Sequence, residues 1–341
     1  MTLNRHDLEK SAGILAAALA IPALFILAAG KSPIAAYGAL VGYTLGSVNG
    51  FSEVVVHAIP LTLMGLGVAV AFRGAIFNIG GDGQLIVGAV MAVALSPWLG
   101  RLPIPLGLLG FLAAGFAGGA ALGAIVGWLR ARFDANEIIV TIMLNYVALQ
   151  LLAWVIRGPL QEPMHIFPSS FSIVSQLYLV PLFAGSPVHG GLIVALLAAA
   201  IVHVAMRHTA FGFRVTVIGE SSGAAAYAGI SWKRTIVEAM LVSGGLAGLA
   251  GAIEIAAIHH KLQDDFASGY GLTAIAVALM ARLSPLGVPF TALLFGVFYA
   301  GAGALQREAS IPFPIVWIIE GTAIFAFLLY GVAARRAAAA S

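Results

Sequence analysis

The 341-residue sequence has no cysteine and very little charge. Without cysteine there can be no disulfide, no thiolate metal site and no cysteine nucleophile. Charged residues make up 9% of the chain, whereas hydrophobic residues make up 61%. Soluble domains have about 25% charged residues, so a soluble core could not absorb this much apolar sequence. No linker or low-complexity segment divides the chain, and the sequence therefore predicts one integral-membrane domain over residues 1–341.

Apolar runs of about 20 residues, the length that spans a bilayer, predict an all-α polytopic membrane protein with about ten transmembrane helices. A cleaved signal peptide is the alternative interpretation of the first run, which follows a short cationic leader. The eighth run is short. The predicted spans are Ala12–Ala29, Val54–Phe72, Leu85–Leu99, Ile104–Leu129, Ile138–Ile156, Val188–Met206, Ile236–Ala256, Leu272–Ala281, Val288–Leu305 and Pro314–Val332.

The lysines and arginines predict the orientation of these spans, because they concentrate in cytoplasmic loops. Ten crossings with both termini in the cytoplasm put twelve of the seventeen on the inside. The outer five are Lys31, Arg101, Arg157, Lys261 and Arg307. The small net charge of +3 forms no basic patch with interleaved aromatic residues, so no nucleic-acid partner is expected.

A polar, glycine-rich break, Phe77–Gln84, lies between the second and third predicted spans. Three of its residues 80–83 are glycines, which disfavour a regular helix because each costs roughly 1 kcal/mol against alanine. In a membrane, such a break is tolerated only where it is buried in protein or lines a wet cavity. We therefore expect Asn78, Asp82 and Gln84 to lie near a pathway, where they either contact solute or brace neighbouring helices.

A second polar stretch, Asn136–Tyr146, opens the fifth span. Asn136 can cap the helix N-terminus. Thr141 and Asn145 lie four residues apart on one helix face, and a polar stripe inside a span usually faces the bundle interior or a pathway. The sequence leaves open whether these two side chains are structural or face the solute.

Glycines recur every fourth residue in the fourth span and are repeated in the seventh. Small residues at this spacing allow two helix backbones to approach closely. The pattern indicates either tight static packing or an interface that changes during a transport cycle. The glycines concerned are Gly115, Gly119, Gly123 and Gly127 in the fourth span and Gly244, Gly248 and Gly251 in the seventh.

The longest predicted cytoplasmic loop, Arg207–Thr235, contains a sequence typical of a short helix. Ser221 or Ser222 can cap it, small residues continue it, and Gly229 can end it in the left-handed conformation. Such a helix could fit into a groove on another protein or be a plain connection.

Other candidate sites carry weaker signals. Glu254 and Glu320 are carboxylates within or near spans, which can indicate proton coupling. His259, His260, Asp264 and Asp265 form an outer cluster whose spacing is not diagnostic of a metal site, so no metal is expected. The triplet at Gly30 lacks the first glycine of a phosphate loop, and the break at residue 80 lacks the third glycine of a dinucleotide fingerprint.

Taken together, the break at 77–84, the Asn136–Tyr146 stretch and the loop at 212–230 resemble permease subunits of bacterial ABC importers. The family is the branched-chain amino acid, ribose and simple-sugar permease superfamily. The forms Phe-Asn-Ile-Gly-x-x-Gly-Gln and Asn-Glu-x-Ile-x-Thr-Ile-Met-Leu-Asn-Tyr are similar to its nucleoside and simple-sugar branch. The resemblance covers about residues 50–335, and one departure is Asp82, where that branch more often has glutamate.

This resemblance implies a non-enzymatic transport subunit of a bacterial inner membrane. It implies three protein partners besides the lipid: a cytoplasmic ABC ATPase that holds ATP and Mg²⁺, a second permease subunit that is a non-identical homologue, and an extracytoplasmic solute-binding protein. The chain itself would hold no cofactor. Neutral, polyhydroxylated nucleosides (purine nucleosides first) or simple sugars would be the solutes, and branched-chain amino acids the alternative.

The resemblance also assigns residues. The coupling helix between spans six and seven, which docks into the ATPase, would include Glu220, Ser221, Ala224, Ala225, Ala228 and Gly229. The residues expected to line the pathway are Asn78, Asp82, Gln84, Thr141 and Asn145. Two other classes compete with this hypothesis: a proton-driven secondary transporter using Glu320, and an intramembrane enzyme, for which no paired catalytic groups are found.

Overall fold

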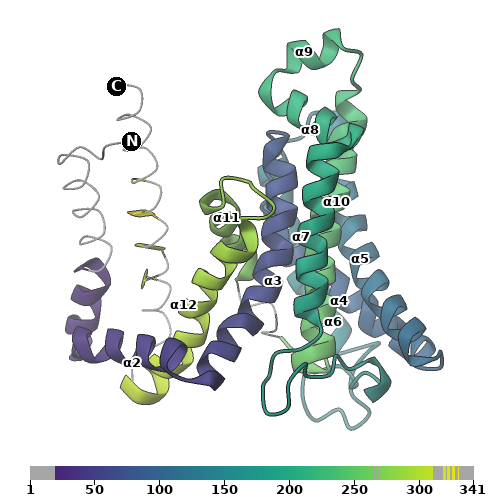
Figure 1. Ribbon diagram of the computed structural model, residues 1–341. Coiled ribbons are helices and arrows are strands. Elements are labelled where there is room, and N and C mark those ends of the chain that lie inside the picture. The colour runs from purple at the N-terminus through teal and green to yellow at the C-terminus, as the bar shows by residue number, and fades with distance from the viewer. Residues whose placement is uncertain are drawn as a thin grey trace, which may run out of the picture. The chain divides into compact units, whose positions relative to one another are not determined.

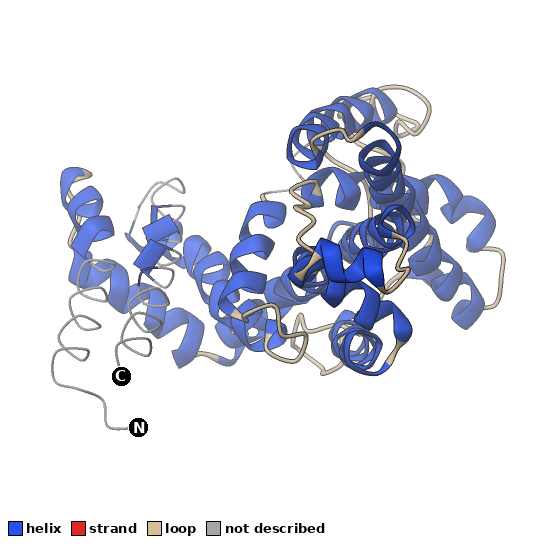
Figure 2. Cartoon of the chain, turned by 90° about the horizontal axis from the view of Figure 1, so that it is seen from above, coloured by secondary structure: helices blue, strands red, loops and turns tan. Residues whose placement is uncertain are grey.

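The computed structural model describes residues 20–264, 266, 269–309, 318–319, 321–322, 325–326 and 329. Helices dominate this part of the chain, and no strand forms in it (Figure 2). The helical residues form two compact units, one of residues 1–57 with 293–341 and one of residues 58–292. The helices α3 and α12 each contribute to both.

Seven helices are long and apolar enough to cross a membrane. They coincide with the second to seventh and the ninth predicted spans, although most begin or end a few residues beyond the apolar run. They are α3 (Val48–Arg73), α4 (Gly81–Leu99), α5 (Ile104–Phe133), α6 (Glu137–Ile156), α7 (Gly191–His208), α10 (Trp232–Glu254, which continues through the π-helical turn η2, Ile255–His259) and α12 (Val288–Ala309).

The remaining predicted spans have different outcomes. Only part of the first, Ala12–Ala29, lies in the described residues: Ala20–Ala28 is helical there and is followed by α2 (Pro33–Gly46), with 113° between the two helices. The sequence analysis missed α2, whose apolar run is interrupted by glycines and hydroxyl side chains. The eighth corresponds to α11 (Tyr270–Met280), an 11-residue helix of about 16 Å that is too short to span a bilayer. The tenth lies largely outside the described residues, so ten crossings and the side of the termini stay predictions.

The smaller unit packs the first two helices against the end of α12. Its buried cluster contains Ile26, Leu40 and Leu305. Beside it, the Tyr43 hydroxyl donates to Glu53 at 2.7 Å, and the Arg307 guanidinium lies 5.3 Å from the centre of the Tyr43 ring. Aromatic and charged side chains are therefore partnered within this unit.

The larger unit is organised around α4, α5 and α10, which make the most extensive helix–helix contacts in it. Its two ends differ (Figure 1). One end carries α8 (Ala210–Glu220) and α9 (Ser222–Tyr227), and the other carries the irregular segment 157–190 with the short 3₁₀ helix η1 (Ser175–Leu177). The break at residues 74–80 connects α3 to α4 and positions the candidate site.

Candidate functional site

The polar break is a structured connection between α3 and α4. After Arg73, the amides of Gly74 and Ile76 both donate to the carbonyl of Ala71, and Ala75 takes a left-handed conformation with φ of 54°. Helix α4 then begins at Gly81, and its first backbone bond runs from the Gln84 amide to the Gly80 carbonyl. The predicted break over residues 77–84 is therefore too long: residues 81–84 form the first turn of α4 despite their glycines, and the irregular connection ends at Gly80.

Asn78 is the centre of this connection and is only 2% exposed. Its side-chain nitrogen donates to Gln84 Oε1 at 2.9 Å and to Ser243 Oγ at 2.8 Å. Gln84 donates back to Asn78 Oδ1 at 3.1 Å, and the same oxygen accepts from the Gly80 amide at 3.0 Å. The two amide side chains therefore form a reciprocal pair that joins the break to α4 and α10.

Asn145 and Asp82 extend the same connection to two further helices. The Asn145 side chain of α6 accepts from the Gly83 amide at 2.8 Å and donates to the Ile79 carbonyl at 3.0 Å. The Asp82 carboxylate accepts from the Gly271 amide of α11 at 2.7 Å. The break and the first turn of α4 are thus tied to α6, α10 and α11 by these hydrogen bonds.

Thr141, the fifth predicted pathway residue, has no exposed surface. Its hydroxyl donates to the carbonyls of Glu137 and Ile138 in its own helix, at 2.7 and 3.0 Å. Among the predicted residues, Asn78, Gln84 and Thr141 therefore have their polar atoms occupied by protein groups. In this arrangement Asn78 and Gln84 brace neighbouring helices, whereas the Thr141 hydroxyl bonds only within α6. Contact of these residues with solute stays a prediction.

A small cavity lies beside the break, between Met64 of α3, Gln84 of α4, Ser243 of α10 and Ala274 of α11. It has room for about one water molecule. Because small-molecule pockets typically enclose about 300–1,000 Å³, the cavity is not a solute site.

The sequence analysis missed two partners in this network, Ser243 and Gly271. Ser243 stands alone among the glycines of its span, and a lone serine in a span is a weak signal. Gly271 contributes only its backbone amide, which has no signature in the sequence. Both lie more than 160 positions from their partners in the break.

The glycines of α5 and α10 face one another. A Cβ atom added to Gly119 would lie 2.7 Å from the Cα of Gly248, and one added to Gly123 would lie 3.2 Å from the Cα of Gly244. Gly115 and Gly127 continue the contact toward Ala252 and Val237. Gly88 of α4 also meets the backbone of Gly248, so three helices approach at one level.

The predicted short helix in the loop at 207–235 is α9. Ser221 caps it by accepting from the Ala224 amide at 3.2 Å, and Gly229 follows it with φ of 68°. Tyr227 is 97% exposed, whereas Ala225 is 2% exposed and packs inward. Small and aromatic side chains of α9 therefore face outward, whereas the buried Ala225 packs against the rest of the chain.

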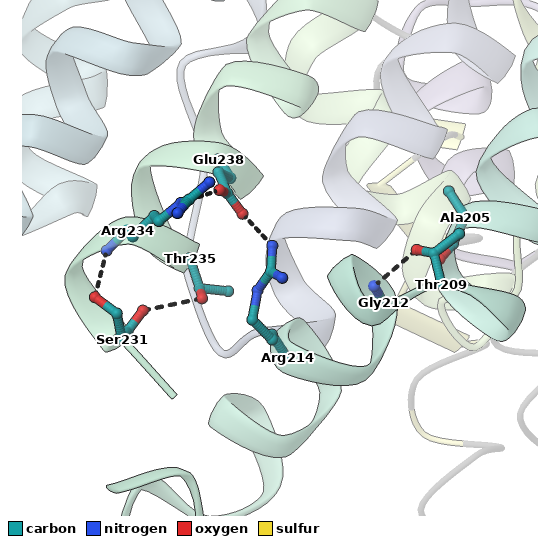
Figure 3. Close-up of polar contacts among 8 residues, drawn as sticks. All are labelled: Ala205, Thr209, Gly212, Arg214, Ser231, Arg234, Thr235 and Glu238. Atoms are coloured by element: carbon teal, nitrogen blue, oxygen red, sulfur yellow. Dashed lines mark hydrogen bonds and ion pairs between the residues drawn. The ribbon is translucent and has the colours of Figure 1, made fainter. Parts of the chain in front are cut away.

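Helix α8, which the sequence analysis did not predict, forms the base of α9. Arg214 of α8 pairs with Glu238 of α10 at 2.6 Å, and Arg234 pairs with the other Glu238 oxygen at 2.7 Å (Figure 3). Ser231 caps α10 by accepting from the Arg234 amide. The Arg214–Glu238 pair therefore joins α8 to the start of α10, and α9 lies at one end of the unit (Figure 1).

The described His and Asp residues of the cluster at 259–264 do not converge. The His259 Nε2 atom lies 3.6 Å from Glu254, while the His260 ring stacks on Tyr178 with 3.8 Å between ring centres. Asp264 instead pairs with Arg157 at 2.5 Å. Asp265 and Glu320 lie outside the described residues. The segment 157–190 is thus fastened to residues 260–264 by ion pairing and stacking.

Comparison with known proteins identifies the family of this chain. Residues 50–332 match the family described as the permease component of the branched-chain amino acid transport system. The chain belongs to this permease family. The permease is therefore a multi-pass membrane transport component and not an enzyme, and the resemblance inferred from the three motifs is confirmed.

Its relatives include a glucose ABC transporter permease from Haloferax volcanii, 38% identical over 90% of this chain and 83% of the relative. A guanosine ABC transporter permease from Bacillus subtilis is 36% identical, covering 88% and 87%. A nucleoside ABC transporter permease from Lactococcus lactis is 35% identical, covering 89% and 85%. Bacillus subtilis also has a second guanosine permease, 27% identical over 71% of this chain and 77% of the relative.

Proposed function

We propose that the permease is the membrane subunit of an ATP-driven importer for nucleosides, purine nucleosides first, or for simple sugars, in a bacterial inner membrane. The observation that carries this proposal is the set of relatives named for guanosine, nucleosides and glucose, at 35–38% identity over most of the chain. A neutral solute also suits a chain with few charged groups, 9% of its residues, in its spans and loops.

The ATPase partner would dock on α9. Tyr227 and Ala224 are exposed on this helix, and Ala228 follows it, so the helix offers a small-residue surface with one projecting ring. The pairing of Arg214 and Arg234 with Glu238 connects α9 through α8 to the start of α10. Movement of the ATPase, which would bind the ATP and Mg²⁺, could thus be passed to a long membrane helix.

A second, non-identical permease and a solute-binding protein complete the proposed assembly. The two different guanosine permeases of Bacillus subtilis support a paired arrangement of unlike subunits. The segment 157–190 lies at the opposite end of the unit from α9, so it is the proposed contact for the binding protein on the outer side (Figure 1). Alternating access would follow from repacking of the helices around the break.

Uptake by the reconstituted transporter tests this function. The permease is co-expressed with the ATPase, the second permease and the binding protein of the proposed assembly, and uptake of labelled guanosine, glucose and leucine is measured. ATP-dependent uptake of guanosine or glucose is expected, and an ATPase variant that cannot hydrolyse ATP should abolish it.

Two results would redirect the proposal. Leucine uptake with no response to guanosine or glucose would indicate the branched-chain amino acid alternative. Uptake that survives without ATPase, follows a proton gradient and is lost on Glu320→Gln would indicate a secondary transporter.

A further inference from the structure

The outward face of α6 differs in chemistry from an ordinary lipid-facing surface. Met143, Tyr146 and Trp154 are 53%, 62% and 64% exposed, and Gln150 is exposed between them. At intervals of three and four residues, these four side chains lie on one face of the helix, which they share with the exposed aliphatic side chains of Ile139 and Val147. Thr141 and Asn145 lie on the opposite side, toward the break.

Helix α7 provides the contrast. Before the basic last turn of α7, its exposed large hydrophobic side chains are all aliphatic, as expected for a surface in contact with lipid. They are Ile193, Leu196, Leu197, Ile201 and Val204, from 51% to 66% exposed. Both helices qualify as membrane spans by length and hydropathy, so the difference lies in what covers each face and not in their general composition.

The position of Gln150 makes lipid contact costly. It lies six residues before Ile156, the last residue of α6, or about 9 Å along the axis, well inside a hydrocarbon core of about 30 Å. A carboxamide without hydrogen-bond partners in such a medium costs several kcal/mol, and polar residues within spans therefore face a protein interior or water. An exposed glutamine at this depth accordingly indicates a wet surface.

We propose that the α6 face formed by Met143, Tyr146, Gln150 and Trp154 lines the translocation pathway and contacts a neutral solute with a flat ring. The inference rests on the proposed importer function and deepens it by naming the solute contact. The Tyr146 ring offers a stacking surface at mid-membrane, and the Gln150 amide one turn away offers a donor and an acceptor together. A purine base presents the complementary ring face and donor–acceptor edge, whereas a pyranose presents hydroxyl groups.

The absence of cysteine allows a direct test of wetness. A single Gln150→Cys variant is compared with Leu197→Cys, because Leu197 is 57% exposed and lies six residues from the N-terminal end of α7, at the level matching Gln150. The assembled transporter is treated with a charged methanethiosulfonate. Only a hydrated thiol forms the reactive thiolate, so we expect Gln150→Cys to react at least tenfold faster than Leu197→Cys.

Solute protection and uptake complete the test. Saturating guanosine should slow labelling of Gln150→Cys several-fold, while Leu197→Cys stays unreactive. Gln150→Leu should raise the KM for guanosine about tenfold, the effect of losing one hydrogen bond or more, and Gln150→Asn should retain part of the affinity. Leu197→Ala serves as the control that leaves uptake unchanged.

Three outcomes would overturn the inference while leaving the importer function in place. One is equal labelling of the two cysteines. Another is labelling of Gln150→Cys that appears only when the second permease is omitted, which would show that the face is a subunit interface. The third is a normal KM for Gln150→Leu. If the wild-type transporter shows no ATP-dependent uptake of guanosine or glucose, the proposed function itself is refuted.

Discussion

The Asn78 side-chain nitrogen lies 2.8 Å from the Ser243 hydroxyl oxygen, which joins the break before α4 to the middle of α10 across 165 positions of sequence. Because α10 begins beside α8 and α9, the same helix connects the proposed ATPase contact to the break. The break is therefore a braced joint, and displacement of α10 would pull on Asn78, on its partner Gln84 and through them on α4.

Replacing Asn78 should destabilise this joint. Asn78→Leu removes the amide group that bonds to both Gln84 and Ser243. Leaving these two buried side chains unpaired lowers the free energy of unfolding by about 1–3 kcal/mol. Thermal unfolding of the purified permease should show a lower Tm. Thr141→Val is the control, since the Thr141 hydroxyl bonds only to carbonyls of its own helix, and its effect should be smaller than that of Asn78→Leu. Equal Tm values for the two variants would show that the Asn78 pairs contribute nothing to stability.

The contact between α5 and α10 predicts a sharp dependence on glycine. Gly248→Ala would place a methyl group 2.8 Å from the Cα of Gly119, so the two backbones must separate, at a cost of about 1–3 kcal/mol. Gly42→Ala in α2 is the matched control, because a Cβ there has no heavy atom within 4 Å, and it should be neutral or stabilising by up to about 1 kcal/mol. A Tm for Gly248→Ala at or above that of Gly42→Ala would contradict this packing.

The sequence predicted seven of the membrane helices, because runs of about 20 apolar residues leave little choice in a bilayer. It also located the break, since glycines and amides interrupt an otherwise apolar pattern. It did not identify Ser243 or Gly271 as partners of the break. Those contacts depend on how distant helices pack, and no local pattern encodes the pairing.

The orientation of α6 shows the same limit. Its polar residues form two stripes, one through Thr141 and Asn145 and one through Tyr146 and Gln150. Spacing separates the stripes but does not show which of them faces the other helices. The structure turns Asn145 toward the break, where it bonds to Gly83 and Ile79, and this choice leaves Tyr146 and Gln150 exposed.

Replacing two nearby residues of α9 should give two different phenotypes. Tyr227→Ala should lower co-purification of the ATPase at least several-fold with an unchanged Tm, because this ring is 97% exposed and has no packing role within the chain. Ala225→Arg should instead lower the Tm, since the residue is 2% exposed and has no room for a charged side chain. Wild-type recovery of ATPase by Tyr227→Ala would remove the ring from the interface.

His189 lies in the irregular segment two residues before α7 begins, and its burial predicts a pH dependence of stability. It is 2% exposed, and its Nδ1 accepts from the Gly191 amide at 3.2 Å. Burial lowers the pKa of His189 from 6.5 to about 4. The unfolded chain therefore binds more protons than the folded one between these values. Stability from this group is fully present above pH 6.5 and is lost as the pH falls toward 4.

Between pH 7 and pH 5 the expected loss from His189 is about 1–2 kcal/mol, which thermal unfolding across this range would detect as a falling Tm. His189→Asn keeps a side-chain acceptor near the Gly191 amide but cannot titrate, so its Tm should fall less over the same range. His165→Asn, at an exposed position in the loop, is the matched control and should follow the wild type. If His189→Asn loses as much stability as the wild type between pH 7 and pH 5, other groups govern the acid response and the neutral state of His189 has no measurable effect.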